Sequence, residues 1–193
     1  MRRSFAAAFA ALAIGCAVPA LAQAQQADPA ALIAAQKEAL APLSIMDGVW
    51  RGPAWALDRA GRHDSTQTER IGPFLGGAVK MIEGRGYRAS GEVSFNAFAV
   101  ISYDPATRSY TISSWAQGRS GDFPLTVTGD GYVWTIPAGP NAVIRYTAVI
   151  KGDAWREIGE YIVEGQPASQ IFEMNLKRIG DTDWPGVGAI PKE

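Results

Sequence analysis

The sequence predicts an all-β protein: a single antiparallel up-and-down barrel of eight to ten strands, preceded by a short N-terminal helix. From Met46 onward, runs of six to twelve residues rich in Val, Ile, Thr, Tyr, Phe and Trp alternate with Gly, Asp, Asn and Pro. This spacing is typical of hairpin-linked strands, and no window of helical length interrupts it. The chain of 193 residues is 47% apolar, enough for one domain with its own core. So many consecutive strands favour a barrel or a sandwich, and we favour the barrel.

Residues 1–24 have the order of a secretory signal peptide. Two arginines precede an apolar run over 4–19, and the small residues Ala22 and Ala24 form an A-x-A cleavage pattern. The run is too short and too rich in alanine to be a good transmembrane span. We therefore predict cleavage near Ala24 and a periplasmic or secreted location in a bacterium.

The sequence contains one cysteine and one histidine. A disulfide framework needs at least two cysteines, and a Cys/His zinc site needs more ligands than one cysteine and one histidine, so both are excluded. Cys16 ends a loose lipobox, and a lipoprotein anchored through Cys16 is the alternative to cleavage near Ala24. The 18 Lys and Arg residues nearly balance the 19 Asp and Glu residues, which argues against a nucleic-acid partner.

Residues 25–45 form the predicted N-terminal helical segment. Asp28 can cap the helix and Pro29 suits its first turn. The barrel domain is predicted over residues 46–179, and a flexible tail over 180–193. The predicted strands span residues 46–57, 65–73, 77–89, 92–103, 109–117, 122–129, 131–137, 141–150, 154–164 and 169–178.

Two features at the ends of the barrel domain carry a family resemblance. Gly48-Val49-Trp50-Arg51-Gly52 begins the first strand, and Arg178 shares the phase of the apolar residues on the last strand. A buried guanidinium needs a partner, which an indole can supply by stacking. This pattern resembles the lipocalin (calycin) pattern. Over about residues 35–179, the order of a short helix, this glycine and tryptophan strand, Gly76-Gly77, Tyr103-Asp104-Pro105 and Glu173-Met174-x-Leu176-x-Arg178 resembles an uncharacterised bacterial family of secreted lipocalin-like proteins. The resemblance implies an up-and-down barrel whose cavity takes a small apolar molecule.

The glycine and tryptophan pattern over 48–52 is also distantly similar to nitrobindin-like haem-binding barrels. Those barrels use a histidine near the final strands as the iron ligand, and residues 154–178 contain none. The sole histidine, His63, falls in a predicted polar turn over 58–64. We therefore predict no cofactor and no metal ligand.

Glu157 is the candidate polar group inside the barrel. If the hairpin over 154–178 keeps its apolar phases together, Glu157 points inward. It would then pair with Arg178 or Arg85, remain a neutral acid with a raised pKa, or anchor a ligand. Large or polar side chains expected to line the cavity form the predicted ligand-binding set: Trp115, Trp155, Glu157, Tyr161 and Arg178.

Strands 92–103 and 109–117 each have two apolar faces. The pattern does not decide which of the two faces points into the barrel. Because the outward face is then apolar as well, we predict that the N-terminal helix or a partner, such as a second copy in a homodimer, covers part of the outside.

The predicted function is an exported protein that binds a small hydrophobic molecule. One alternative is a barrel enzyme in which Glu157 or His63 does acid/base chemistry, and another is a filled barrel that acts as a structural or interaction module. The sequence contains no phosphate loop, nucleophile elbow or metal-site spacing. This favours a binding protein over an enzyme, with no catalytic residue predicted.

Overall fold

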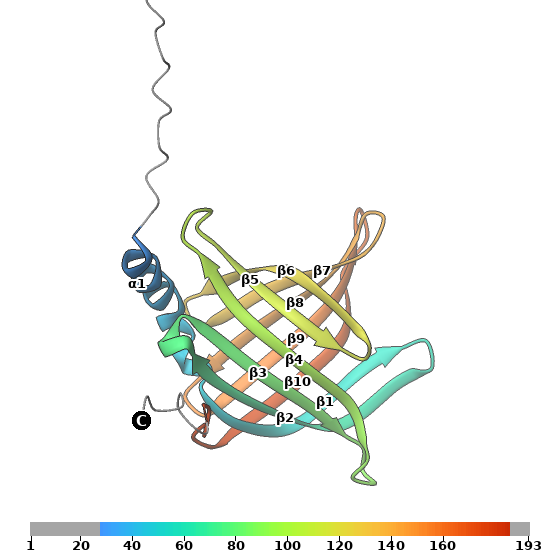
Figure 1. The fold of residues 1–193 in the computed structure, drawn as a ribbon. Coiled ribbons are helices and arrows are strands. Elements are labelled where there is room, and N and C mark those ends of the chain that lie inside the picture. Colours follow the sequence, from blue (N-terminus) through green and yellow to red (C-terminus); the bar gives the residue numbers. More distant parts are fainter. Residues whose placement is uncertain (1–27, 186–193) are drawn as a thin grey trace, which may run out of the picture.

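Ten antiparallel strands close into one barrel (Figure 1). The computed structural model describes residues 28–185, so the predicted leader over 1–24 lies outside the described residues. The strands run in chain order around the barrel, and the first pairs with both the second and the last. Their bounds are β1 Gly48–Asp58, β2 Gly61–Phe74, β3 Val79–Tyr87, β4 Val93–Asp104, β5 Ser109–Ala116, β6 Arg119–Thr128, β7 Gly131–Gly139, β8 Ala142–Lys151, β9 Ala154–Val163 and β10 Ser169–Gly180. The predicted fold class is confirmed.

Alternation along the strands decides which side chains enter the barrel. On β4 and β5, Ala99, Ile101 and Ile112 are buried in the core. Phe98 and Trp115 point to the other side, with ring centroids 6.0 Å apart, and Trp115 is 49% exposed. The inner face left undecided by the sequence is therefore the one that carries Ala99.

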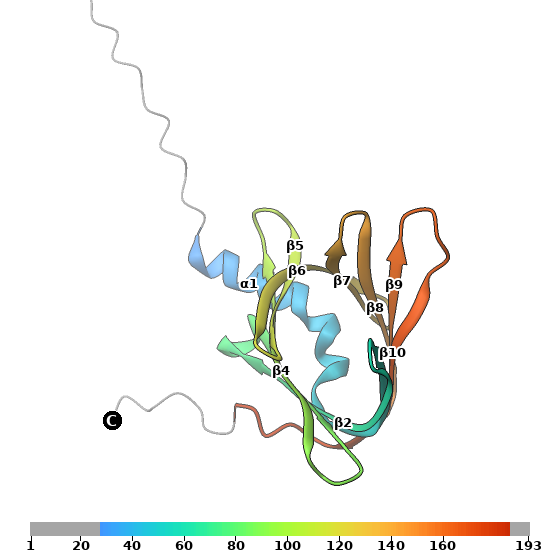
Figure 2. The ribbon, with the colours of Figure 1, turned by 90° about the vertical axis from the view of Figure 1, so that its right-hand side faces the viewer.

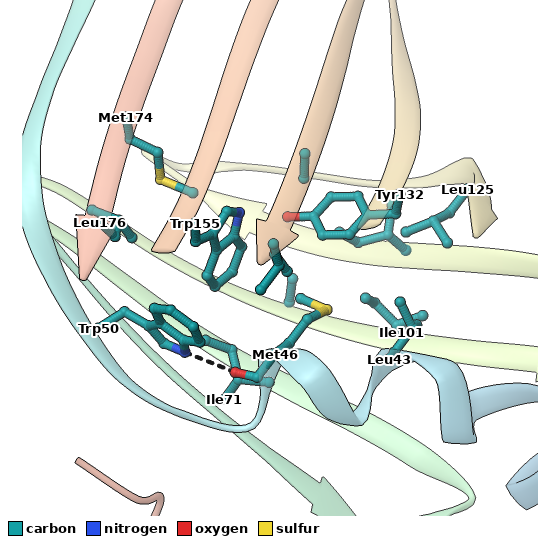
Figure 3. Close-up of a cluster of buried hydrophobic side chains, with 14 of the residues drawn as sticks. Leu43, Met46, Trp50, Ile71, Ile101, Leu125, Tyr132, Trp155, Met174 and Leu176 are labelled. Carbon is teal, nitrogen blue, oxygen red and sulfur yellow. Dashed lines mark hydrogen bonds between the residues drawn. The ribbon is translucent and has the colours of Figure 1, made fainter. Parts of the chain in front are cut away.

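A helical segment closes one end of the barrel (Figure 2). Helix α1 (Pro29–Leu40) is capped by the Asp28 side chain and continues into the 3-10 helix η1 (Ala41–Met46). Leu43 and Met46 are fully buried. Figure 3 shows them packed beneath the strands, where the indole of Trp50 donates a hydrogen bond to the Met46 carbonyl at 2.8 Å. These residues form the floor of the barrel. Within residues 28–185, no helix combines the length and apolar character that a membrane crossing needs.

The glycines of the first strand allow close contacts at the seam between β1 and β10. A Cβ atom at Gly52 would lie 2.0 Å from the carbonyl oxygen of Asn175. A Cβ atom at Gly48 would lie 2.8 Å from the Arg178 guanidinium, which donates to the Asp47 carbonyl at 2.6 Å. The glycine pattern therefore has a structural role, since it lets the last strand and Arg178 approach the first strand closely.

The segment after β10 packs against the barrel as far as Pro185. Trp184 contacts Phe74 edge to face, with ring centroids 5.9 Å apart. Arg70 of β2 lies 5.6 Å from the Trp184 ring and 3.3 Å from a carboxylate oxygen of Asp183. The start of the predicted tail over 180–193 is thus held on β2, and residues 186–193 lie outside the described residues.

Candidate functional site

A cavity of about 750 Å³ occupies the barrel above the floor. Its deep walls come from the inner faces of the strands. Its rim is formed by the hairpins β1–β2 and β3–β4, on which Asp58, Arg62, His63, Asp64 and Arg88 are exposed. Because η1 and Trp50 close the opposite end, the cavity opens at the hairpin end.

Aromatic rings make up one wall of the cavity. The rings of Trp134 and Tyr146 are stacked, 4.6 Å apart with an interplanar angle of 17°. Tyr146 also meets Phe172 edge to face at 5.8 Å, and Tyr132 meets Trp155 edge to face at 6.4 Å. Such a wall offers apolar contact to a bound molecule.

Glu157 projects into the cavity from β9 and is 5% exposed. Its carboxylate accepts hydrogen bonds from the Tyr132 hydroxyl at 2.7 Å and from the Trp134 indole nitrogen at 3.2 Å. Burial raises its pKa above the usual range, and these two hydrogen bonds oppose the rise. Glu157 therefore occupies the inward position that alternation predicts.

Neither of the ion pairs predicted for Glu157, with Arg178 or with Arg85, forms. Arg85 pairs with Glu83, and Arg178 bonds the Asp47 carbonyl and Asp181. Both guanidiniums therefore have partners away from the cavity.

A second buried carboxylate, Glu69 on β2, also lines the cavity. It accepts a hydrogen bond of 2.7 Å from Gln67, two residues earlier on the same face. Gly84 of β3 makes room for it, because a Cβ atom there would lie 2.8 Å from the carboxylate. Burial is the main cause that raises the Glu69 pKa to about 8, and the charge of Glu157 adds to the rise.

The sequence reasoning missed Glu69, although a signal for it was present. Gln67 and Glu69 share the phase of Ile71, which is fully buried. On a strand, that phase places all three side chains on the inner face.

The two carboxylates also affect neighbouring tyrosines. Burial and the charge of Glu157 raise the pKa of Tyr146 to about 12, and the same two causes raise the pKa of Tyr132 well above its usual value. Both phenols therefore remain protonated at neutral pH, and Tyr132 acts as a hydrogen-bond donor to Glu157.

Trp155 contributes an unsatisfied donor. Its indole is 1% exposed, and its Nε1 atom has no hydrogen-bond partner among residues 28–185. Figure 3 shows this nitrogen on the side of the ring turned away from Trp50 and the floor. A buried N–H group without a partner costs free energy, and the Trp155 side chain that carries it lines the cavity.

The five sequence-predicted site residues separate into two groups. Trp155 and Glu157 line the cavity together. Trp115 lies on the outer face, Tyr161 is 37% exposed beyond the cavity on β9, and Arg178 lies at the closed end beside Gly48. Tyr161 has the inward phase, but its strand extends past the cavity wall.

His63 lies at the rim rather than deep in the cavity. The region predicted as a turn over 58–64 is mostly strand, because β2 begins at Gly61 and His63 pairs with Ala56. The His63 imidazole Nε2 lies 2.9 Å from Asp58, and the side chain is half exposed. The deep wall of the described cavity contains no imidazole, so these residues do not fit a haem bound through histidine.

Comparison with known proteins supports the barrel assignment. No family model matches the sequence, and no curated protein matches it. Among solved structures, the crystal structure of Rv2717c from M. tuberculosis is similar, with a TM-score of 0.55 and 14% identity over 72% of this chain and 96% of that chain. At this identity the similarity concerns the fold alone. This chain thus shares its fold with another ten-stranded antiparallel β-barrel.

Proposed function

We propose that this protein is an exported, lipocalin-like binding protein that holds a small, largely apolar molecule in the barrel cavity. The cavity of about 750 Å³ carries this proposal. Its size falls within the usual range for ligand sites, and its walls combine aromatic rings with a few buried polar groups. Export rests on the charge, apolar run and small-residue exit of residues 1–24.

A filled barrel that serves only as a structural module does not agree with this cavity. An enzyme that uses an internal carboxylate remains a second candidate, favoured by the Glu69 pKa of about 8. A carboxyl group with such a pKa can act as a general acid at neutral pH. Binding is the stronger proposal because it requires only the cavity and its walls.

Native mass spectrometry of the protein purified from the periplasm of its own cells tests the proposal. We expect a mature chain that begins after Ala24 and that carries a non-covalently bound small molecule. Full-length protein found only in the cytoplasm would contradict export.

Two neighbouring serines on β5 offer a matched control for the cavity. Ser114 lines the cavity, whereas Ser113 lies on the outer face and donates to Asp122 at 2.6 Å. Ser114→Phe should fill part of the cavity and remove the bound molecule, and Ser113→Phe should retain it. Loss of the molecule from both variants, or from neither, would contradict binding in the cavity.

A further inference from the structure

Among the charged residues that line the cavity, those in the deep part are all acidic, whereas the rim carries both acidic and basic residues. Acidic residues occupy the deep wall: Glu69 on β2 and Glu157 on β9. The lining cations, Arg62 and Arg88, lie on the exposed rim, where Arg62 pairs with Asp64 at 2.9 Å. No ion pair involves either deep carboxylate within residues 28–185.

The one buried cation among residues 28–185 bonds a partner outside the cavity. Lys80 is 4% exposed and bonds Asp47 at 2.6 Å, next to the closed end of the barrel. A molecule in the deep part of the cavity therefore meets two carboxylates and no compensating cation from residues 28–185.

The hydrogen-bonding capacity of the carboxylates is only partly used. A carboxylate offers about four acceptor sites. Glu157 accepts two hydrogen bonds and Glu69 accepts one from Gln67. A buried carboxylate without a cationic partner is costly, so the remaining sites favour a ligand that brings donors and a positive charge.

The aromatic wall and Trp155 indicate the rest of the ligand. The rings of Trp134 and Tyr146 line the cavity and offer an apolar surface to a ring-bearing body. The buried Nε1–H of Trp155, which faces away from the floor, requires an acceptor atom (Figure 3). The preferred occupant thus has a donor-rich cation, an apolar ring and an oxygen acceptor.

We propose that the cavity selects an organic cation, a protonated primary or secondary amine on an apolar, ring-bearing body, with its ammonium group between Glu69 and Glu157. This inference rests on the proposed binding function and adds the charge of the ligand. A fatty acid or another anionic ligand would place a negative charge beside two acidic groups with no cation to balance it, and is disfavoured.

Binding of such a cation is coupled to proton release. Burial keeps Glu69 protonated below a pH of about 8 when the cavity is empty, and a nearby ammonium favours the ionised form. The deep titratable groups that face the cavity are Glu69 on β2, Glu157 on β9, Tyr132 on β7 and Tyr146 on β8, and Glu83 on β3 acts on Glu69 through its charge. The deep cavity residues contributed by β1, β4, β5 and β10 are not titratable.

Three probes that share one ring system and one ether oxygen test the charge preference. They are 2-(1-naphthyloxy)ethylamine, 2-(1-naphthyloxy)ethanol and 1-naphthyloxyacetic acid, each titrated into the purified mature protein by isothermal calorimetry at pH 8. We expect the amine to bind at least roughly tenfold more tightly than the alcohol, because a charge-assisted hydrogen bond in a buried site is stronger than a neutral one. The acid should bind most weakly. The amine's affinity should rise by up to about tenfold per pH unit between pH 6 and 8, while the alcohol's stays constant.

Variants identify the groups responsible for the preference. Glu69→Gln and Glu157→Gln keep the side-chain size and should lower the affinity for the amine while preserving that for the alcohol. Glu69→Gln should also remove most of the pH dependence. Glu160→Gln is the matched control, because Glu160 lies on β9, pairs with Arg145 at 2.8 Å and does not line the cavity. Thermal melting confirms that each variant is folded.

The outcomes separate the two proposals. Equal or tighter binding of the alcohol or the acid would overturn the charge preference and leave the proposed binding function standing. An amine affinity unchanged in both cavity variants would also overturn it. If none of the three probes binds and native mass spectrometry finds no retained molecule, both proposals fail.

Discussion

The Glu69 carboxyl makes the stability of the fold depend on pH. Its pKa is about 8 in the folded chain and near 4.5 when exposed in the unfolded chain. Between these values the folded state holds a proton that the unfolded state has released. This contribution is therefore fully present below about pH 4.5 and is lost as the pH rises through 8.

We expect the free energy of unfolding to fall between pH 5 and 8, by at most about 1.4 kcal/mol per pH unit from this group. Glu69→Gln should remove that part of the slope and stabilise the protein at pH 8 to 9. Urea unfolding of the wild type and the variant over this range measures it. An identical slope in both proteins would show that Glu69 is exposed or already ionised.

At the scale of single elements, the seam between β1 and β10 depends on the missing side chain of Gly52. Gly52→Ala should destabilise the barrel by about 3 kcal/mol or more, because its Cβ would overlap the Asn175 carbonyl and the backbone must move. Gly129→Ala is the control, since a Cβ at Gly129 meets nothing within 4 Å. Urea unfolding compares the two variants, and equal stability would rule out the close approach at the seam.

The floor formed by η1 gives a second prediction for an element. Leu43→Ala should cost about 2–5 kcal/mol, because Leu43 is fully buried between the helical segment and the strands. Ile45→Ala, in the same turn but 42% exposed, should change stability much less. Chemical denaturation measures both. Equal losses would mean that η1 does not close the barrel.

The sequence predicted the elements well because each has a local cause. Alternation and turn residues placed all ten strands, and Asp28 and Pro29 placed the start of α1. The polar composition of residues 58–64 predicted a turn, whereas most of this segment is strand. Polar residues also suit the exposed end of a long hairpin such as β1–β2. The sequence could not provide the length of β9 relative to the cavity, which is why Tyr161 falls outside it. Nor could it decide the inner face of β5, which is why Trp115 falls outside it.

The site was harder to predict than the fold because it depends on contacts across the barrel. Glu157 was found from its own strand, but its partners Tyr132 and Trp134 come from β7. Glu69 is accommodated by a glycine on β3. Such combinations require the register of several strands, which one strand's pattern does not contain.

For the whole molecule, closure of the barrel joins the two ends of the domain. The pairing of β1 with β10 brings together the most distant strands in the sequence. Since non-local contacts slow folding, we expect refolding on the order of milliseconds to seconds or slower. Stopped-flow tryptophan fluorescence after dilution from urea measures it, and refolding complete within microseconds would contradict closure through this seam.

Two neighbouring indoles can report whether the cavity is occupied, one as the signal that changes and the other as the signal that stays constant. The rings of Trp50 and Trp155 lie 5.6 Å apart, yet the Trp50 N–H is bonded to the Met46 carbonyl and the Trp155 N–H has no partner in the described chain. In a nitrogen-labelled sample, the Trp155 indole resonance should shift when the cavity fills, while that of Trp50 stays in place. Occupancy of the cavity can therefore be followed by nuclear magnetic resonance without labelling the ligand or substituting a residue of the protein.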